Sequence, residues 1–460
     1  MIKKSLMILS ISAAYFANAQ DISTIRNTSE VYSNSSLNGT SKYNSMTGSM
    51  GALGGDFSVL NSNPAGVGVS IASEVSGTLS IESSKNTTSY AGKSLDYKVN
   101  NTDLGNVGGI AVFQIDSSPW KFVNVAVNYS NQSLEDYTET PGNSDLVYEI
   151  RDADNNLVDE LAFAGHAYNR YGNLSKMSVG VGGNYDNRIY VGAGLNFHNS
   201  VLDQYDSAAF TNNADITDVY DKQYTPFSES ASGFSASVGV IGKISPQLRL
   251  GAALETPTWW KIARVYSEYE NPVDGTYTED RDLSTPMKAT LSAAYVANKN
   301  FAINVDYSLG LTKPKYKVYG DAETELNQFF SDNYSNLSEL KVGAEYRVQA
   351  FRLRGGYGFV ASPFDSMSIQ TVAGNTAYDN LILGKRNTIA AGIGYDFKSF
   401  FIDAAYQNVS SEYSNPFIQG SAANNTGYFS SQYIVESDAA IVSNVKNKKD
   451  NFFITLGWKF

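Results

Sequence analysis

The last nine residues of the chain, FFITLGWKF at positions 452–460, alternate between large apolar side chains and small or polar ones. Successive side chains of a β-strand point to opposite faces, so the segment has one apolar face and one mixed face. This pattern is typical of a strand that crosses a membrane with lipid on one side. An aromatic residue at the end of that face is also usual in outer-membrane barrels. The segment therefore predicts a final barrel strand, whose apolar residues are Phe452, Ile454, Leu456, Trp458 and Phe460.

The same two-residue period recurs upstream and predicts an all-β, fourteen-stranded antiparallel transmembrane barrel. Tight connections alternate along the chain with much longer ones, as the short periplasmic turns and long external loops of such barrels do. An exported soluble all-β protein is the alternative, but regular alternation of connection lengths is not expected of it. The expected strands are residues 70–84, 105–116, 120–134, 175–185, 188–202, 232–244, 248–265, 286–298, 300–318, 338–349, 351–360, 387–398, 400–414 and 449–460.

Composition narrows the functional classes. The chain has 460 residues, a net charge of −12 and no cysteine. A negative chain repels the phosphate backbone, so nucleic acid is not an expected partner. Without cysteine there is no disulfide framework, thiolate-bound zinc, iron–sulfur cluster or lipoprotein anchor, and no cofactor is predicted. The 38 glycines and 31 tyrosines, with only 17% charged residues, suit barrel strands.

The N-terminus has the three parts of a secretory signal peptide, which predicts that residues 1–19 are removed on export. Lys3 and Lys4 precede an apolar stretch at residues 6–16, and residues 17–19 form a small-x-small cleavage site. A short membrane anchor is the alternative, but the stretch is shorter than the roughly 20 apolar residues that span a bilayer, and no later segment reaches that length. An exported chain can still span a membrane if its strands close into a barrel. We therefore expect a barrel in a Gram-negative outer membrane, in contact with its lipid and lipopolysaccharide.

The face opposite the apolar one is expected to line the lumen, and it carries charges of both signs. On the lipid face each Arg or Lys would cost about 2–4 kcal/mol near the midplane, so the consistent parity of these charges supports the assignment. Fourteen strands enclose more space than their side chains fill, so the lumen is either open water or plugged. The predicted lumen residues are Glu82, Gln114, Asn196, His198, Arg249, Glu255, Asp306, Lys341, Glu345, Arg347, Arg352, Arg354, Asp396, Asp403 and Lys459.

Residues 20–69 precede the first strand and are the candidate plug, with the barrel at residues 70–460. The run at 48–68, GSMGALGGDFSVLNSNPAGVG, is too irregular for a strand and too apolar for a free tail. Its glycines permit tight turns and its Asn-Pro dipeptide interrupts a helix, which suits a compact segment inside a barrel. A disordered linker is the alternative. A phosphate-binding loop is not expected, because no Gly-Lys-Ser/Thr follows the glycines.

The run MGALGGD at residues 50–56, the following Asn63-Pro64-Ala65-Gly66, the fourteen strands and the terminal Phe460 resemble the FadL-type outer-membrane transporters of long-chain fatty acids and other hydrophobic compounds. The resemblance implies an N-terminal hatch in the lumen, capture of an apolar substrate from outside, and release through a gap in the wall into the outer leaflet. It also implies an interrupted third strand at the gap, here within residues 120–134, where neither glycine nor proline marks a kink. By the motif, the hatch residues are Gly54, Gly55, Asp56, Asn63, Pro64 and Ala65.

A carboxylate headgroup needs one or two cations in the pocket that receives it. Arg347, Arg352 and Arg354 lie together on two consecutive lumen-facing strands and are the candidates. The sequence favours the alternative, in which these arginines form structural bridges with interior carboxylates. Those carboxylates are Glu345, Asp396 and Asp403.

Two smaller predictions concern local structure. Residues 159–168 and 323–334 carry apolar side chains at helical spacing and are expected to form short helices at the barrel mouth, with solvated turns as the alternative. Trp259 and Trp260 are expected in the aromatic girdle rather than in the lining of a substrate groove.

Other functions fit the sequence less well. A haem receptor needs an axial ligand. The chain has only two histidines, His166, which is expected in a long loop, and His198 on the predicted lumen face. A barrel enzyme needs a Ser/His/Asn or Asp/His constellation at the mouth, and no such spacing occurs. A general-diffusion or structural barrel, in which residues 20–69 leave the lumen open, is the principal alternative to a transporter.

Overall fold

The computed structural model describes residues 22–34, 38–115, 119–152, 154–267, 276–421 and 426–460. The predicted signal peptide, residues 1–19, lies outside the described residues, as do residues 20, 21 and 35–37 of the predicted hatch.

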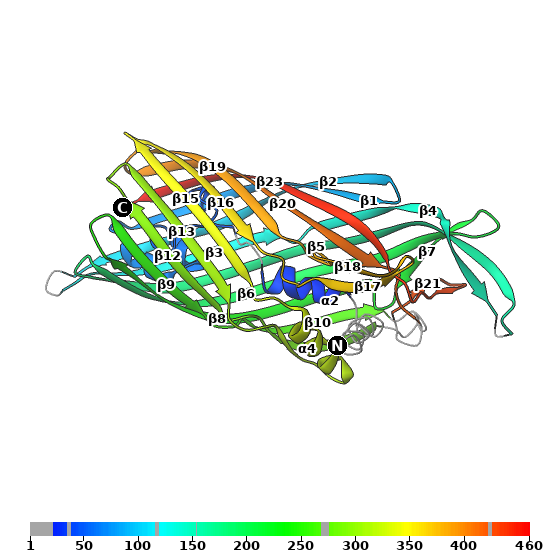
Figure 1. Ribbon diagram of the computed structural model, residues 1–460. Helices are drawn as coiled ribbons and strands as arrows, with labels where there is room; N and C mark the ends of the chain where they lie inside the picture. Colours follow the sequence, from blue (N-terminus) through cyan, green and yellow to red (C-terminus); the bar gives the residue numbers. More distant parts are fainter. Residues whose placement is uncertain (1–21, 35–37, 116–118, 153, 268–275, 422–425) are drawn as a thin grey trace, which may run out of the picture.

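Fourteen antiparallel wall positions close into a barrel, which confirms the predicted all-β fold (Figure 1). The first strand, β1 (Glu74–Tyr90), pairs on one side with β2 (Lys93–Gln114) and on the other with the last strand, β23 (Ile441–Lys459), so the sheet closes on itself. Four positions hold two strands in line, separated by a short interruption. The positions between β2 and β23 are β3 (Trp120–Ser133) with β4 (Asp136–Arg151), β5 (Leu157–Tyr185), β6 (Ile189–Thr211), β8 (Phe227–Lys243), β9 (Leu248–Glu255) with β10 (Trp259–Ser267), β11 (Thr276–Ser284) with β12 (Lys288–Val296), β13 (Phe301–Gly310) with β14 (Lys315–Lys317), β15 (Ser338–Val348), β16 (Phe351–Val360), β19 (Arg386–Asp396) and β20 (Phe400–Phe417).

The alternation at the C-terminus orients β23 as predicted. Phe452, Ile454, Leu456 and Trp458 are 45% to 56% exposed, whereas the intervening Phe453 is 1% exposed. Outward apolar side chains recur on the neighbouring strands and form a belt around the barrel. Such a belt is favourable against lipid and unfavourable against water.

Several wall strands continue well beyond this belt, on the side away from the C-terminus (Figure 1). β5 has 29 residues and includes residues 159–168, so the predicted helix there is wrong. The reason is a β-bulge between Phe163 and Gly165. The bulge shifts the inward-facing parity by one residue, so that Leu161 and Tyr168, seven residues apart, face the same side, as they would after two turns of a helix. The buried side chains of this stretch are Leu161, Phe163, His166 and Tyr168.

The extended strands build a lobe at the end of the barrel away from the C-terminus, and we call this end the external end. Its sheet adds β7 (Thr217–Lys222), β21 (Tyr428–Phe429) and β22 (Ile434–Val435) to β4, β5 and β6. The lobe has its own small apolar core, which includes Phe163, Phe210, Tyr220, Phe417 and Tyr428.

The external mouth is covered by α4 (Asp321–Asn333) and by the hairpin of β17 (Met367–Thr371) and β18 (Gly374–Tyr378) (Figure 1). α4 confirms the helix predicted at residues 323–334. Its apolar face is buried in the largest core cluster of the protein through Leu326, Phe329 and Phe330.

Before β1, residues 22–32 and 38–69 lie inside the barrel in two layers, and both are almost wholly buried (Figure 1). We call residues 22–32 the outer plug and residues 38–69 the inner hatch. None of the helices described is long and apolar enough to span a bilayer. The helical elements are α2 (Ile22–Asn27), the π-helical η1 (Thr28–Tyr32), α3 (Ser41–Ser45), η2 (Phe57–Asn61) and η3 (Pro64–Val69).

Candidate functional site

Asn63 holds the Asn-Pro-Ala motif of the inner hatch in place. Its Oδ1 accepts a hydrogen bond from the Ala65 N–H at 3.0 Å and caps η3, while Pro64 occupies a first-turn position where no N–H is needed. Its Nδ2 donates to the Gly51 carbonyl at 2.8 Å and to the Val240 carbonyl of β8 at 3.3 Å. One buried amide therefore ties the motif to the rest of the hatch and to the wall.

Asp56 plays a similar part at η2. Its Oδ1 accepts from the Ser58 N–H at 2.8 Å and its Oδ2 accepts from the Thr40 hydroxyl at 2.7 Å. Just before it, Gly54 and Gly55 turn the chain with φ of +65° and +74°, a region that favours glycine. The six predicted hatch residues thus meet in one assembly of turns and caps. Their part in transport stays a prediction.

Glycines of the wall allow the hatch to approach the strands closely, and we call them the wall socket. A Cβ added at Gly239 would lie 2.0 Å from Asn63 Oδ1, and one added at Gly192 would lie 2.4 Å from the Pro64 carbonyl carbon. The sequence signal for the socket is the recurrence of glycine at lumen-facing positions of adjacent strands. The other members are Gly108, Gly180, Gly182, Gly343, Gly356 and Gly392.

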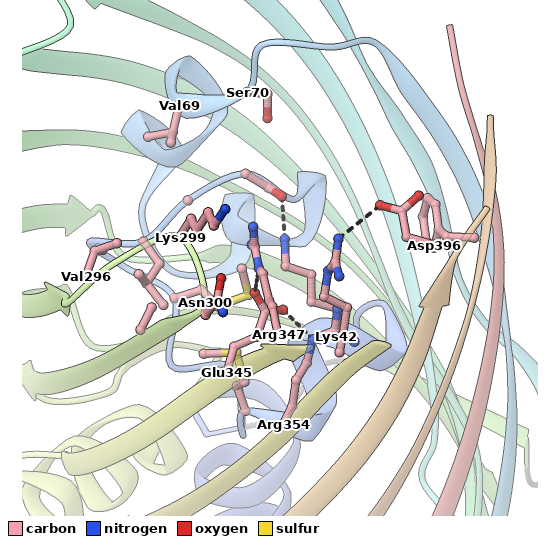
Figure 2. Close-up of a pocket in the computed structure, with 18 of the residues that line it drawn as sticks. Lys42, Val69, Ser70, Val296, Lys299, Asn300, Glu345, Arg347, Arg354 and Asp396 are labelled. Carbon is pink, nitrogen blue, oxygen red and sulfur yellow. Dashed lines mark hydrogen bonds and ion pairs between the residues drawn. The ribbon is translucent and has the colours of Figure 1, made fainter. Parts of the chain in front are cut away.

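A cavity of about 580 Å³ lies between the inner hatch and the end of the barrel where the chain terminates (Figure 2). Met46, Met50 and Leu53 of the hatch and Phe301 and Phe401 of the wall give it apolar surfaces. Its charged side chains are seven cations and four carboxylates, an excess of positive charge in a chain that is negative as a whole. They are Lys42, Arg249, Lys299, Arg347, Arg352, Arg354 and Lys459, with Glu74, Glu345, Asp396 and Asp403.

The structure brings the predicted headgroup arginines together in this cavity, where they are ion-paired. Arg354 Nε lies 2.7 Å from Glu345 Oε2, and its Nη1 lies 2.7 Å from Asp403 Oδ1. Arg347 Nε lies 2.6 Å from the other oxygen of Glu345. These are bridges of the kind that the alternative expected.

Arg352 is held more loosely. Its Nη2 lies 3.4 Å from Asp396 Oδ2, and the same oxygen is 2.7 Å from Lys459 Nζ. Arg352 therefore shares its carboxylate with a second cation. The headgroup role of the three arginines stays a prediction.

Two further cations of the cavity, which were not among the predicted headgroup residues, contact the hatch backbone directly. Lys42 Nζ donates to the Gly55 carbonyl at 2.6 Å, and Arg249 Nη1 donates to the Leu53 carbonyl at 3.1 Å. Within the described part of the chain, neither forms an ion pair with a carboxylate. Arg249 already stood on the predicted lumen face, whereas the position of Lys42 depends on how the hatch folds. Both are available to an anion without breaking an existing ion pair.

The wall is split on its external side between β2 and β4. The ladder of β2 with β3 ends at Asn106 and Ser130. Beyond it, β2 goes on pairing with β1 to the hairpin turn, and within the described residues β4 pairs with β5 alone. The break between β3 and β4 falls at Leu134 and Glu135, at the end of the interval where the resemblance implies an interrupted strand.

Side chains bridge the split where the backbone ladder is missing. Asn86 Nδ2 of β1 donates to Asp136 Oδ1 at 2.8 Å and to the Tyr137 carbonyl at 2.7 Å. The rings of Tyr97 and Tyr137 face each other across it with centroids 4.1 Å apart. Contacts of this kind separate more readily than a continuous strand ladder, because few bonds hold the two sides.

Both histidines are engaged in local contacts. His166 lies in β5, not in the loop expected for it; its Nε2 is 2.9 Å from Asp206 Oδ1 and its ring stacks on Phe417 with centroids 4.1 Å apart. His198 faces the lumen as predicted, with Nε2 3.2 Å from Ser235 Oγ. Among the residues that the structure describes, no group of three or more His, Asp or Glu side chains is placed to hold a metal ion.

No protein-family model matches this chain, and no curated protein matches it in sequence. Solved structures with a similar fold include a Pseudomonas aeruginosa FadL homologue, with 11% identity, a TM-score of 0.56, and coverage of 93% of this chain and 99% of that one. They also include the P. putida toluene transporter TodX, with 13% identity, a TM-score of 0.52, and coverage of 94% of this chain and 99% of that one. The Ralstonia pickettii toluene transporter TbuX has 13% identity, a TM-score of 0.51, and coverage of 92% of this chain and 98% of its own. Over nearly its whole length, this chain therefore has the fold of the FadL homologue and of these two toluene transporters.

Proposed function

We propose that this protein is an outer-membrane transporter that takes up hydrophobic molecules, such as long-chain fatty acids, through a plugged barrel with release through the wall. The observation that carries the proposal is the split between β2 and β4 beside a lumen that the inner hatch fills. Burial of each methylene is worth about 0.8 kcal/mol, so an apolar molecule is poorly served by a wet pore. A side exit into lipid spares it that contact with water.

The apolar belt supports a place in the outer membrane, with lipid and lipopolysaccharide around it. Export by the signal peptide at residues 1–19 is part of the proposal. The tight turns lie at the end of the barrel that carries the C-terminus, and the long strands and the lobe lie at the other end (Figure 1), which supports an orientation with the lobe outside.

The cavity beside the hatch supports an amphiphilic anion as substrate. Its apolar surfaces suit an acyl chain, and its excess of cations suits a carboxylate. Arg347, Arg352 and Arg354 are the proposed headgroup residues, with Lys42 and Arg249 beside them. Two of the structurally similar proteins are toluene transporters, which supports a hydrophobic substrate without choosing between an acid and an uncharged compound.

The hatch must move if a substrate is to pass, and the cysteine-free chain permits a direct test. Ser41 Oγ of α3 lies 2.8 Å from Thr455 Oγ1 of β23, so the pair Ser41→Cys with Thr455→Cys should form a disulfide that fixes the hatch to the wall. Uptake of a radiolabelled long-chain fatty acid by cells that express this variant should fall to background when the disulfide is oxidised, and should return with a reductant.

The matched control uses the same wall residue. Thr78 Oγ1 of β1 lies 2.7 Å from Thr455 Oγ1, so Thr78→Cys with Thr455→Cys joins two wall strands and leaves the hatch free. Uptake by the control should not change on oxidation. Equal uptake by the oxidised hatch variant and the oxidised control would overturn the proposal that the hatch moves.

A further inference from the structure

The apolar belt ends in a row of aromatic side chains on the outward face of β6, β8 and β10. Phe197, Phe234 and Trp259 are 36% to 49% exposed and lie opposite one another in the strand register. Toward the external end, the next outward side chains of β8 are serines, at positions 232, 230 and 228. An aromatic girdle of this kind lies where the hydrocarbon of a bilayer meets its headgroups. The surface just beyond the row is therefore at the level of the headgroups.

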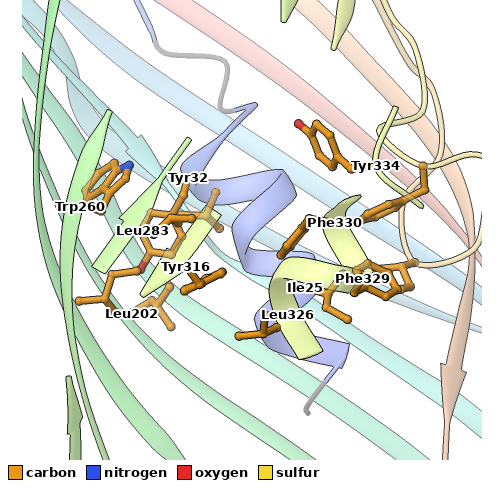
Figure 3. Close-up of a cluster of buried hydrophobic side chains, with 14 of the residues drawn as sticks. Ile25, Tyr32, Leu202, Trp260, Leu283, Tyr316, Leu326, Phe329, Phe330 and Tyr334 are labelled. Atoms are coloured by element: carbon orange, nitrogen blue, oxygen red, sulfur yellow. The ribbon is translucent and has the colours of Figure 1, made fainter. Parts of the chain in front are cut away.

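The first row beyond the girdle carries alternating charges on three neighbouring strands. Lys261 of β10 lies opposite Asp282 of β11, and Asp282 lies opposite Lys317 of β14. All three side chains are exposed. Figure 3 shows their sequence neighbours Trp260 and Leu283 directed into the buried cluster inside the barrel. Because successive side chains of a strand point to opposite faces, the charged row faces outward.

The two lysines of this row are available to an anion. Within the described residues, neither Lys261 nor Lys317 forms an ion pair or donates a side-chain hydrogen bond, although Asp282 lies between them in the register. Lys313, two positions before β14, is engaged instead, because its Nζ donates to the Ser331 carbonyl of α4 at 2.6 Å.

Lys317 is held in place by the elements on both sides of β14. One edge of β14 pairs with β11. At its other edge, Asn327 of α4 accepts a hydrogen bond from the Tyr316 N–H at 2.7 Å and donates one to the Tyr316 carbonyl at 2.9 Å. The spacing of the charged row is thus set before any ligand arrives, which lowers the entropic cost of binding.

A depression of about 800 Å³ opens on this part of the outward surface. The small side chains of Ser230 and Ala263 leave the space, and the longer side chains of Lys261, Lys317 and Tyr319 border it. Tyr319 is 97% exposed. A volume of this size is in the range of sites that bind small molecules, and it is large enough for a disaccharide.

The depression combines three kinds of contact. Its lysines supply charge-assisted donors for phosphate, and the exposed tyrosine ring supplies an apolar face with a polar tip. The carboxylates of Asp280 and Asp282, which also line it, accept hydrogen bonds from hydroxyl groups. The other two charged groups are engaged, since Glu323 accepts a backbone hydrogen bond at 3.2 Å and Arg281 pairs with Glu279 at 2.9 Å. A simple anionic lipid gains nothing from the carboxylates, whereas a phosphorylated sugar uses all three contacts.

We propose that this depression binds the phosphorylated sugar headgroup of a lipopolysaccharide molecule in the outer leaflet. Lys261 and Lys317 contact its phosphates, Asp280 and Asp282 accept hydrogen bonds from its hydroxyls, and its acyl chains lie along the apolar belt below Trp259. The inference rests on the proposed outer-membrane location, with the lobe outside, and adds to it a defined lipid site on the outer surface of the wall.

The test measures binding of lipid A, the phosphorylated and acylated disaccharide of lipopolysaccharide, to the full-length protein in detergent. Native mass spectrometry gives the fraction of protein with bound lipid at each lipid concentration. Lys261→Gln with Lys317→Gln should raise the apparent Kd by about tenfold, because two charged donors to phosphate are lost. Lys261→Arg with Lys317→Arg should stay within about twofold of the native protein, because the charges remain.

Lys446→Gln with Lys448→Gln is the matched control. These lysines are exposed on β23, on the external side of the outward Phe452, and their loss changes the net charge by the same amount. The control should bind lipid A as the native protein does. An unchanged Kd of the Lys261→Gln, Lys317→Gln variant, or an equal rise in the control, would overturn the inference.

Two further lipids separate lipopolysaccharide from other anionic lipids. Lipid A without its phosphates should bind the native protein about tenfold more weakly. Phosphatidylglycerol, which has a phosphate but no sugar, should also bind more weakly than lipid A. Equal affinity for phosphatidylglycerol and lipid A would show a site for any anionic lipid and contradict the assignment. Binding in detergent needs no transport, so this test and the uptake test of the hatch disulfide fail independently.

Discussion

Gly239 illustrates how much one missing side chain decides in this protein. A Cβ there would lie 2.0 Å from Asn63 Oδ1, so Gly239→Ala should push the Asn63 amide out of its place and loosen the hatch. The variant should insert normally but show ion leakage in planar bilayers. Gly355→Ala is the control, because its added Cβ would meet no heavy atom closer than 3.8 Å. Equal conductance of the two variants would contradict the wall socket.

Glu30 gives the outer plug a pH dependence of definite sign. Burial by itself raises the pKa of Glu30, but the guanidiniums of Arg170 and Arg26 outweigh burial and hold the pKa at about 2 instead of 4.5. A carboxylate with a lowered pKa stabilises the docked state above its free pKa, and this stabilisation is lost as the pH falls from 4.5 toward 2. The plug should therefore stay docked at neutral pH and loosen only in that acidic range.

Fluorescence of Trp260 reports this transition, because its ring contacts Tyr32 of the plug. Trp260 is isolated by replacing the other three tryptophans with phenylalanine. Its emission should be constant above about pH 5 and change below it, and Glu30→Gln should remove the part of the change that Glu30 causes. A transition of equal size with Glu30→Gln would show that another group controls the plug.

The two adjacent tryptophans show what sequence can predict for single residues. Trp259 is 49% exposed, as expected of the aromatic girdle, whereas Trp260 is 2% exposed and faces the lumen, so the prediction for Trp260 is wrong. Neighbours on a strand must face opposite sides, so only one of them could belong to the girdle. The parity of the strand was available from the sequence. The partner of the inward ring, Tyr32, was not, because it belongs to another segment.

At the scale of whole elements, prediction worked where one strand face meets lipid. Inside the apolar belt the alternation is strict, and the strands lie where the sequence placed them. Beyond the belt the outer face is polar, so apolar and polar side chains no longer alternate along the strand. The ends of β5 and β6 could not be recognised there, and both strands are longer than predicted. The interruption between β3 and β4 carries no glycine or proline, and it is recognised only when the pairing of β2 with β3 is known to stop.

The split should control exit from the barrel. Tyr97→Cys with Tyr137→Cys, joined by a short bis-maleimide, would fix the two sides together, since the native rings are 4.1 Å apart. Uptake of a labelled fatty acid should fall severalfold after cross-linking. Tyr171→Cys with Tyr205→Cys is the control, because these rings lie side by side on β5 and β6, which are already paired. Equal uptake by both cross-linked variants would argue against exit at the split.

At the scale of the whole molecule, a filled lumen predicts a closed channel. The full-length protein should show negligible steady conductance in planar bilayers, and deletion of residues 20–69 should produce large conductance through the fourteen-stranded wall. Large steady conductance of the full-length chain would instead support a general-diffusion barrel.

The barrel and its plugged lumen could be predicted from the sequence. The alternation of apolar and polar residues and the number of strands are each indicated by many residues at once, so errors at single positions do not change the result. The site was predicted only in part. The hatch motif and the three arginines lie in the lumen as the sequence predicted, and their roles in transport stay predictions. The wall socket, the Lys42 and Arg249 contacts and the outer plug depend on which of many lumen residues meet the N-terminal segment. A single sequence does not encode those distances in any local pattern.

The bond between Ser41 and Thr455 joins residues 414 positions apart, and this separation sets the order in which the molecule can assemble. Residue 41 is synthesised 414 residues before residue 455, so the hatch cannot form its last contacts with the wall until β23 has been made. The pairing of β1 with β23 closes the wall and completes the surface that contacts the hatch. Contacts of such long range fold slowly, so the hatch is the first part of the barrel to be made and among the last to be finished.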